Sequence, residues 1–261
     1  MSLIEAVAIL LAGVAAGTIN AVVGSGTLIT FPTLVAVGVP PLTANISNSL
    51  GLVPGSVAGA VGYRRELVGQ RRRVQRLLVC SVSGAIVGAI LLLVLPAGAF
   101  EAVVPVLIAL GLVLVVVQPR LSARVARRQA EQGQDGDGAW WVAPAVFGTG
   151  IYGGYFGAAQ GVILMAVLGI GIAEGLQRLN AVKNVLVAAA NGVAGVLFVI
   201  VAELNLFGTD AEVDWLLVLL IGVGAVIGGF LGAAVGRKLP PTALRAAIVV
   251  VGLVALVTLL T

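Results

Sequence analysis

The sequence has 261 residues, of which 60% are hydrophobic and 10% are charged, and its mean hydropathy is +1.15. These values lie far above what a soluble core requires, so they exclude a soluble globular protein and indicate an integral membrane protein. The sequence has no histidine and a single cysteine, Cys80, which argues against a disulfide framework, a zinc site or histidine-based hydrolysis. We therefore expect no cofactor and no metal.

The apolar segments are continuous and do not alternate in polarity, which predicts helices and not a β-barrel. The first segment carries Glu5 and lacks the basic residues of a signal peptide, so we expect it to be retained. In chain order the apolar segments lie at residues 2–23, 27–38, 44–63, 77–95, 101–119, 140–156, 161–173, 179–202, 215–236 and 244–260. A polar stretch follows the fifth segment and divides the chain near its middle.

This division predicts one transmembrane domain, residues 1–261, made of two repeats. The first repeat is expected at residues 1–119, a cytoplasmic connecting loop at 120–139 and the second repeat at 140–261. Two segments, 27–38 and 161–173, are shorter than the about 20 residues that an upright crossing requires. They are predicted to be half-helices or strongly tilted pieces beside Gly-rich breaks.

Basic residues gather in three of the connections between apolar segments. They are Arg64, Arg65, Arg71, Arg72, Arg73 and Arg76 in the first, Arg120, Arg124, Arg127 and Arg128 in the second, and Arg237, Lys238 and Arg245 in the third. Because basic loops face the cytoplasm, these three connections are predicted to be cytoplasmic. The acidic connection from Glu203 to Asp214 and the turn from Pro96 to Glu101 are predicted outside. Since the excess positive charge serves orientation, no nucleic-acid partner is expected.

The two halves of the sequence are related by one constant offset, which we call the repeat alignment. It aligns Gly13 with Gly148, Gly26 with Gly161, Asn45 with Asn180 and Val61 with Val196. The second half starts inside and reaches Glu203 outside, so either all three of its first segments cross, or the first two form a re-entrant hairpin and only the third crosses. Both alternatives give an odd number of crossings. If the first half follows the same pattern in the opposite orientation, the sequence predicts an all-α, polytopic membrane helix bundle of two inverted-topology repeats with broken or half-helices at the Gly-rich segments. That architecture is associated with alternating access.

The paired breaks are the first candidate for a substrate-binding site. In the first half the chain reads Gly24, Ser25, Gly26, Thr27, and the matching place in the second half ends in Gln160 and Gly161. Glycine lets the backbone leave helical geometry, and the free N–H groups at the start of the next half-helix attract anions. The alternative is that small residues merely permit close helix packing.

The third segment of each half adds polar residues in register. Asn48 aligns with Lys183 and Ser56 with Asn191, and the candidate substrate-binding residues here are Asn48, Ser49, Ser56, Lys183 and Asn191. Lys183 is the deepest cation in the sequence and is the predicted counter-charge of an anionic substrate. Its alternative role is to extend its ammonium group to the membrane interface beside Arg178. No acidic residue is predicted deep in the membrane, which favours an anion over a cation.

Glycines also recur at every fourth residue in one helix of each half. They are Gly224, Gly228, Gly232 and Gly236 in the second half, and Gly84 and Gly88 in the first. Such faces let helices approach closely, so we interpret them as packing surfaces within the bundle or at a dimer contact. A homodimer is therefore an open alternative.

Several of these motifs together resemble the sulfite exporter TauE/SafE family of membrane permeases over nearly the whole chain. They are the break at Gly24 to Gly26, the run from Ser49 to Arg65 with its Pro54-Gly55-Ser56, then Lys183 and Asn191, and finally the block from Gly228 to Arg245. The resemblance implies a multi-pass protein of a prokaryotic plasma membrane that contacts lipid and transports small sulfur-containing anions such as sulfite or sulfoacetate. The sequence departs from the family at both breaks, which are usually richer in glycine. Thr27 follows Gly26 in the first break, and Ala158, Ala159 and Gln160 replace glycines in the second.

Two other functions fit the same residues less well. A passive anion channel would lack saturation and counterflow. An intramembrane enzyme acting on a lipid phosphate would require a buried histidine, a carboxylate pair or an arginine cluster at its reacting centre. The sequence places none of these inside an apolar segment, so no enzymatic activity is expected.

Overall fold

The structure is a computed structural model that describes residues 1–131, 138–204, 206, 212–235 and 241–260. Within these ranges the chain is helical and contains no strand, which confirms the all-α prediction. The helices are α1 (Leu3–Val22), α2 (Thr27–Ala36), α3 (Pro41–Gly62), η1 (Arg64–Leu67), α4 (Arg71–Val94), α5 (Ala97–Glu131), α6 (Val142–Tyr155), α7 (Gln160–Gly171), α8 (Leu176–Glu203), α9 (Trp215–Val235) and α10 (Pro241–Leu260).

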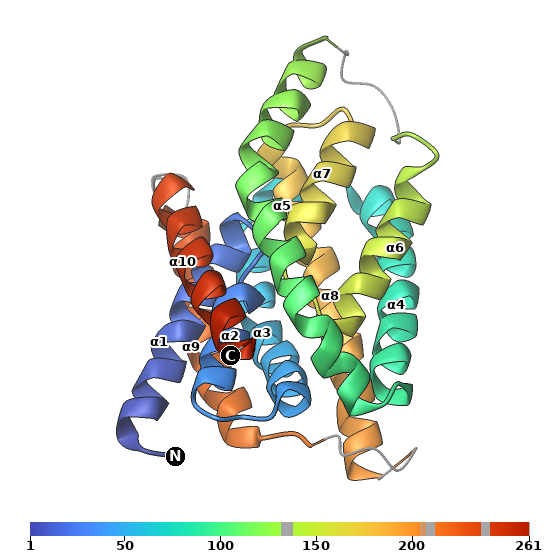
Figure 1. Cartoon of the computed structure of the whole chain (residues 1–261). Helices are drawn as coiled ribbons and strands as arrows, with labels where there is room; N and C mark the ends of the chain where they lie inside the picture. The colour runs from blue at the N-terminus through green and yellow to red at the C-terminus, as the bar shows by residue number, and fades with distance from the viewer. Residues whose placement is uncertain (132–137, 205, 207–211, 236–240, 261) are drawn as a thin grey trace.

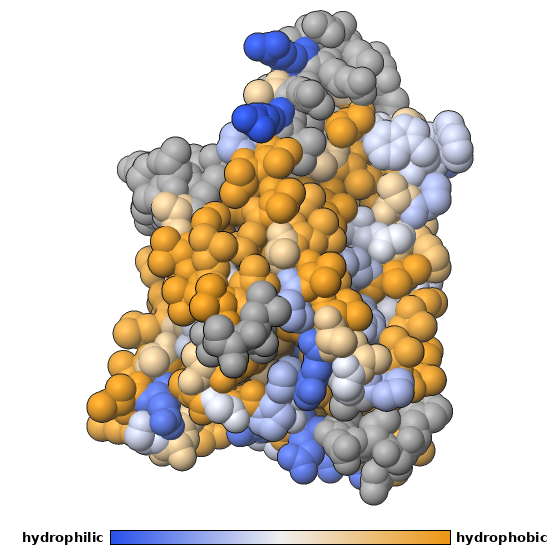
Figure 2. Space-filling view, in the orientation of Figure 1, coloured by the Kyte–Doolittle hydropathy of each residue, from blue (hydrophilic) through white to orange (hydrophobic). Residues whose placement is uncertain are grey.

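Five of these helices, α1, α4, α5, α8 and α9, are long and apolar enough to cross a membrane by length and composition. Large apolar side chains such as Val106, Leu219 and Val254 are exposed on the outer surface, and Figure 2 shows that apolar residues cover much of one face. A surface of this kind would be unfavourable in water but is stable against lipid. The protein is therefore a multi-pass membrane protein.

The connection predicted at residues 120–139 differs from the structure over its first part. Helix α5 continues through the predicted membrane boundary and ends only at Glu131. The part of α5 that follows Pro119 is rich in Arg and Ala and contains neither Gly nor Pro, so the segment is polar and still has good helix propensity. Polarity marked the end of the apolar span correctly, but it did not mark the end of the helix.

The short helices α2 and α7 do not cross the bundle, because each folds back beside the helix that precedes it. Met1 near the start of α1 and Val37 just after α2 line the same cavity, so both ends of this pair lie at one end of the bundle. In the second pair, Ala139 N before α6 donates to Gly171 O at the end of α7 over 2.8 Å. Each pair is thus a helical hairpin whose two ends lie on one side of the bundle, which is consistent with the re-entrant arrangement among the two that the sequence left open.

The two hairpins enter the bundle from opposite ends. Helix α3 starts at the end where the α1–α2 hairpin opens, since Thr43 lines the same cavity as Met1. Helix α3 then runs to η1, which contacts α8, and α8 begins directly after the α6–α7 hairpin. This arrangement is consistent with two inverted repeats.

The last two helices of each half pack on the other half of the sequence. Helix α9 lies against α1 and α3, and α10 contacts α2, whereas α4 lies against α6 and α8, and α5 contacts α7. We call α1, α2, α3, α9 and α10 the first lobe, and α4 to α8 the second lobe (Figure 1). Each contact in one lobe has its counterpart in the other, which again is what a repeated unit would generate.

The described members of the two glycine series lie at contacts inside the lobes, and Gly236 lies outside the described residues. A Cβ added at Gly232 of α9 would lie 2.6 Å from Thr18 O of α1, and one at Gly84 of α4 would lie 3.0 Å from Ile151 N of α6. The backbones therefore touch where these glycines occur. Packing within the bundle accounts for them without a dimer contact.

The contact between Gly232 of α9 and Thr18 of α1 predicts that Gly232→Ala destabilises the protein by about 1 to 3 kcal/mol, because α1 must move away from α9. Gly148→Ala is the matched control, since Gly148 lies inside α6 and a Cβ there would meet nothing within 4 Å. We expect the control to be neutral or slightly stabilising. Thermal unfolding of both variants in detergent measures the effect, and equal melting temperatures would contradict the prediction.

Candidate functional site

The tips of the two helical hairpins touch each other inside the protein. Gly161 N donates to Gly24 O over 3.0 Å, and a Cβ added at Gly24 would lie 2.5 Å from Gly161 Cα. Gly24 has a φ of +89°, a conformation that only glycine adopts at little cost. We call the region around this contact the junction, and glycine is required there for close approach of two backbones.

The second tip turns with less glycine than the first. Gly157 has a φ of +76°, but Ala159 also lies in the left-handed region, with a φ of +61°, alone in this among the described residues other than glycine. Such a conformation costs an alanine roughly 1 to 2 kcal/mol. The Tyr152 hydroxyl donates to Ala158 O and braces this turn. The turn at Ala158 and Ala159 therefore forms at a cost in backbone strain, and the hydrogen bond from Tyr152 stabilises it.

Three side chains of α8 satisfy the carbonyl groups at the end of α1. Lys183 Nζ donates to Asn20 O over 2.9 Å and to Ala21 O over 3.4 Å, while the amides of Asn180 and Asn184 donate to Ala21 O over 3.0 and 3.3 Å. The last carbonyls of a helix have no partner within the helix and carry its negative dipole end, so an ammonium group is favourable there.

Lys183 is 0% exposed, and its ammonium group points into the protein. It therefore does not extend to the membrane interface, which was the alternative role that the sequence allowed. The position places the Lys183 amino group within the bundle, beside the first hairpin tip.

The second hairpin has a matching contact from the first half. Asn45 Nδ2 of α3 donates to Tyr155 O, the last residue of α6, over 3.0 Å. Asn45 is equivalent to Asn180 under the repeat alignment. The third helix of each half thus satisfies the carbonyls at the hairpin tip of the other half, and these contacts hold the halves together at the junction.

Most of the other predicted site residues already have partners within the protein. Asn48 Nδ2 donates to Thr27 Oγ1 over 3.4 Å, and its Oδ1 accepts from the Thr30 hydroxyl. Ser56 Oγ accepts from Asn20 Nδ2 over 3.0 Å. These buried bonds hold α3 against α1 and α2 and thereby fix the first tip.

Two polar side chains at the junction have no partner among the described residues. They are Ser25, with its Oγ, and Gln160, with both Nε2 and Oε1, and each residue is 1% exposed. Ser25 and Gln160 are equivalent under the repeat alignment and stand beside Gly26 and Gly161. A buried polar group without a partner costs about 1 to 3 kcal/mol, so a ligand that supplied hydrogen bonds to these two groups would be favoured here.

The structure gathers most of the predicted site residues around the two tips. Gly24, Ser25, Gly26, Thr27, Gln160, Gly161 and Lys183 lie at or beside the junction, and Asn48 and Ser56 contact residues of the first hairpin. Asn191 Oδ1 lies 4.0 Å from where a Cβ on Gly157 would stand. Ser49 is buried in α3, but no contact joins it to the tips.

Three residues that hold the junction were missed by the sequence reasoning: Asn20, Thr30 and Tyr152. Asn20 carried a signal, because it is a lone amide within an apolar segment, shortly before Gly24. Tyr152 carried none, since its role depends on a turn whose shape is fixed by the rest of the hairpin.

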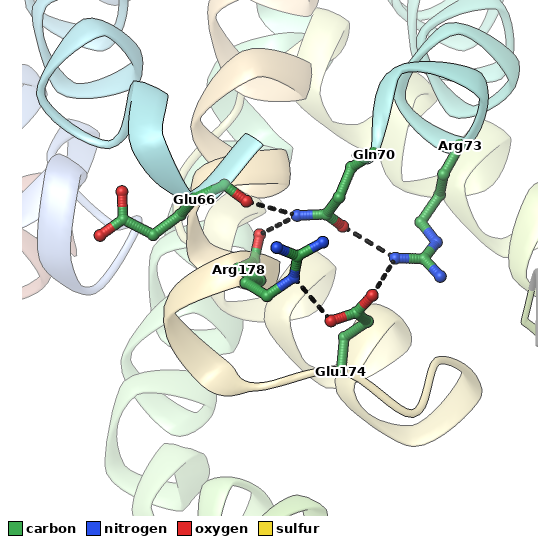
Figure 3. Close-up of polar contacts among 5 residues, drawn as sticks. All are labelled: Glu66, Gln70, Arg73, Glu174 and Arg178. Carbon is green, nitrogen blue, oxygen red and sulfur yellow. Dashed lines mark hydrogen bonds and ion pairs between the residues drawn. The ribbon is translucent and has the colours of Figure 1, made fainter. Parts of the chain in front are cut away.

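A polar cluster lies at the end of the bundle at which α4 and α8 begin (Figure 3). Glu174, in the α7–α8 connection, accepts from Arg73 of α4 over 3.0 Å and from Arg178 of α8 over 2.7 Å. Gln70 Nε2 donates to Glu66 O over 2.9 Å and to Arg178 O over 3.3 Å. We call these residues the basic-end cluster. It ties the α3–α4 connection to the start of α8.

Burial would by itself raise the pKa of Glu174, but the hydrogen bonds from Arg73 and Arg178 outweigh it and hold that pKa below its ordinary value. Glu174 is therefore ionised at neutral pH and bridges two arginines. It lies at the end of the bundle and not at the junction, so it is not a carboxylate of the candidate site.

The two described cavities lie away from the junction. The larger, of about 590 Å³, is at the opposite end from the basic-end cluster and is lined by residues that include Glu5, Thr43 and Asp214. The smaller, of about 270 Å³, lies between α2 and α10. Neither is lined by Ser25 or Gln160, and each of these side chains is 1% exposed, so both are buried in this conformation.

Comparison with known proteins adds independent findings. A family model described as sulfite exporter TauE/SafE matches residues 9–259. A probable membrane transporter protein, ORF9, from Sinorhizobium sp is 27% identical over 85% of this chain and 78% of its own length. The probable membrane transporter protein YfcA from Escherichia coli strain K12 is 26% identical over 86% and 76%, and one from Haemophilus influenzae is 25% identical over 91% and 88%. No solved structure matches this chain.

Proposed function

The chain belongs to the sulfite exporter TauE/SafE family of membrane transporters, and from this premise we propose that it is a secondary transporter of small sulfur-containing anions. The substrate binds at the junction of the two hairpin tips, and alternating access carries it across the membrane.

The observation that carries this proposal is the pair of buried, unpartnered side chains at the junction. Ser25 and Gln160 occupy equivalent places at the starts of α2 and α7, and both present polar atoms that the described part of the protein leaves unsatisfied. Half-helices that meet near the centre of a bundle are the sites at which many transporters bind substrates and ions. Their N-termini present backbone N–H groups to an anion.

The charged side chains near the junction favour an anionic substrate over a cationic one. The Lys183 ammonium group uses two backbone carbonyls as acceptors and can donate three hydrogen bonds in all, so one remains for a substrate oxygen. The described part of α1, α2, α3 and α8 brings no carboxylate to the junction, since Glu5 and Glu203 lie at the far ends of their helices. A cationic substrate would meet Lys183 without a compensating negative charge.

Alternating access follows from the closed junction and from the two lobes. A substrate reaches Ser25 and Gln160 only when the lobes move apart, because both residues are buried in this conformation. We assign the end with the basic-end cluster to the cytoplasm, since basic loops remain on that side, in the plasma membrane of a prokaryote. In this conformation the cluster closes the cytoplasmic side, while the cavity of about 590 Å³ opens on the other.

Flux through the purified protein in liposomes tests the proposal. Sulfite and sulfoacetate uptake is expected to saturate with concentration and to accelerate when the same anion is present on the opposite side. A passive channel would show neither property. Flux that rises linearly and is not accelerated from the opposite side would refute secondary transport.

The basic-end cluster yields a prediction about stability. Glu174→Gln removes the charge that bridges Arg73 and Arg178, so we expect a loss of about 1 kcal/mol at neutral pH, a modest value because solvent screens this partly exposed cluster. Because the pKa of Glu174 is depressed in the folded state, this stability is present above the ordinary carboxyl pKa and is lost as pH falls through the folded-state value. Thermal unfolding against pH measures it.

The difference between wild type and Glu174→Gln should therefore disappear in acid. Glu101→Gln is the control, since Glu101 is exposed at the start of α5, and its melting temperature should match that of the wild type at every pH. A Glu174→Gln deficit that is independent of pH would contradict the assignment.

A further inference from the structure

The carbonyl groups that Lys183 contacts are free because of the way α1 ends. The N–H groups that follow the helix donate to Ile19 O, so Asn20 O and Ala21 O have no donor from the backbone. Lys183 Nζ donates to these two oxygens over 2.9 and 3.4 Å, and these are its hydrogen bonds among the described residues. The amino group of Lys183 therefore has two acceptors in this conformation.

Two acceptors match a neutral amine better than an ammonium group. An ammonium group donates three hydrogen bonds, whereas a neutral lysine has two N–H bonds and a lone pair. In the empty site the third N–H of an ammonium group would lack a partner inside the protein, which is unfavourable. A substrate oxygen beside Lys183 supplies the missing acceptor, so the number of donors required differs between the empty and the loaded site.

The positive charge of an ammonium group would also lack a counter-ion in the empty site. Lys183 is 0% exposed, and it has no ion pair with a carboxylate among the described residues. The carbonyl end of a helix carries only about half an elementary charge, and Ala21 O is shared with the amides of Asn180 and Asn184. An ammonium group at this place is therefore fully compensated only when an anion lies beside it.

The helices around Lys183 bring no second charge to it in the described part of the chain. Helices α3, α6 and α7 contain no charged residue, and Glu5 of α1 and Glu203 of α8 lie at the opposite end from the basic-end cluster. Glu66, Arg73, Glu174 and Arg178 belong to that cluster. The remaining charged or titratable side chains on the elements that contact α8 are Arg64, Arg65, Arg71, Arg72 and Arg76, which are exposed, and the phenol and thiol groups of Tyr63, Cys80, Tyr152 and Tyr155.

We propose that Lys183 takes up a proton when the anion binds and releases it when the anion leaves, so the protein carries a proton across the membrane with each anion. This inference rests on the proposed function. The proton comes from the solution that supplies the anion and forms an N–H bond with the Lys183 lone pair. On the other side the anion departs, that N–H bond breaks, and the proton returns to water. A singly charged sulfonate and its proton then cross without net charge.

The burial of Lys183 couples the two movements. Since its amino group is 0% exposed here, water reaches it only when the site opens, and the site opens to the anion at the same moment. A protein that returned empty with a charged Lys183 would move an unpaired cation through the membrane, and one that carried the anion past a neutral Lys183 would move an unpaired anion. Both are unfavourable, and by linkage the proton and the anion raise each other's affinity by the same factor.

Titration calorimetry on the purified full-length protein measures the proton. Isethionate is the probe, because this sulfonate keeps its single negative charge from neutral to alkaline pH. Binding heats in buffers of different ionisation enthalpy should show the uptake of about one proton per anion in alkaline solution, where the affinity should also fall about tenfold per pH unit. Binding with no proton uptake at any pH would overturn the inference and leave the proposed function intact.

Lys183→Arg distinguishes Lys183 from the other titratable groups. A guanidinium group keeps its charge in proteins, so any anion that this variant binds should be bound without a proton, whatever the affinity. Glu174→Gln is the control, because Glu174 is paired with Arg73 and Arg178 in the basic-end cluster, and this variant should take up as many protons as the wild type. A proton that persists in Lys183→Arg or disappears in Glu174→Gln would refute the inference.

Flux in liposomes tests the coupling in the unmodified protein. Isethionate uptake should acidify the lumen, and an acidic exterior should drive isethionate to accumulate inside. Uptake that leaves the luminal pH unchanged would refute proton transport. If sulfite is the only anion bound, Lys183→Arg still decides, because a proton carried as hydrogensulfite would be taken up by both proteins. Failure of isethionate, sulfoacetate and sulfite to bind would instead overturn the proposed function.

Discussion

Lys183→Ala is expected to weaken anion binding by about 100-fold or more, which corresponds to the roughly 3 kcal/mol or more that is lost when a buried charge is removed from its counter-ion. Lys183 is 0% exposed and lies beside the first hairpin tip. Its removal leaves the substrate anion without a compensating charge in a place that water does not reach. Titration calorimetry with sulfite or sulfoacetate measures the loss.

Arg178→Ala is the control for this prediction. Arg178 lies earlier on the same helix, but its side chain is 37% exposed and bonds Glu174 at the end of the bundle. We expect binding within about twofold of the wild type, because Arg178 is partly exposed and its charge is already paired with Glu174. Equal small effects of the two substitutions would show that Lys183 serves only to satisfy the carbonyls of α1.

A second substitution keeps the test independent of folding. Lys183→Met preserves the length and apolar stem of the side chain, and Ala21 O retains the amides of Asn180 and Asn184 as donors. If Lys183→Met folds with a wild-type elution profile and still binds the anion normally, the counter-charge role is wrong.

Gly24→Ala is expected to abolish transport and to destabilise the protein by more than about 3 kcal/mol. The added Cβ would lie 2.5 Å from Gly161 Cα and 2.7 Å from its carbonyl carbon, so the two hairpin tips would have to separate. The φ of +89° adds a smaller strain for any residue with a side chain. Separated tips would disrupt the junction at which the substrate binds.

Gly38→Ala isolates the steric contribution, because Gly38 has a similar φ of +87° but a Cβ there would meet nothing within 4 Å. This variant should lose only about 1 to 2 kcal/mol and keep its transport rate. Liposome flux and thermal unfolding of both variants measure the difference. If both lose stability and flux to the same extent, then backbone strain and not contact between the tips explains the requirement for glycine.

Much of the fold could be predicted because hydropathy and helix breaks are properties of short stretches of sequence. The helix starting at Thr27 and the one starting near Gly161 were expected at their observed places, since glycine and small polar residues interrupt apolar runs there. The repeat alignment also paired Asn45 with Asn180, and the structure gives both the same role at opposite tips.

Some features of the candidate site could also be predicted from the sequence, and others could not. Ser25, Gln160 and Lys183 were predicted from polarity inside apolar segments, because burying such groups is unfavourable without a partner or a ligand. Which of them lack a partner was not predictable. Thr27 and Ser56 have the same kind of side chain as Ser25, but Asn48 and Asn20 satisfy them from neighbouring helices.

The sequence by itself determined that this protein is a helical membrane protein with two related halves and paired breaks, since burial in lipid imposes apolar segments of fixed length. Only the tertiary structure decided that the short helices fold back as hairpins, that α9 and α4 pack on the opposite halves, and that Lys183 meets Asn20. Most of these contacts join residues that are far apart in the sequence. They depend on how whole helices pack, and no local pattern of polarity encodes the partner that a buried donor will find.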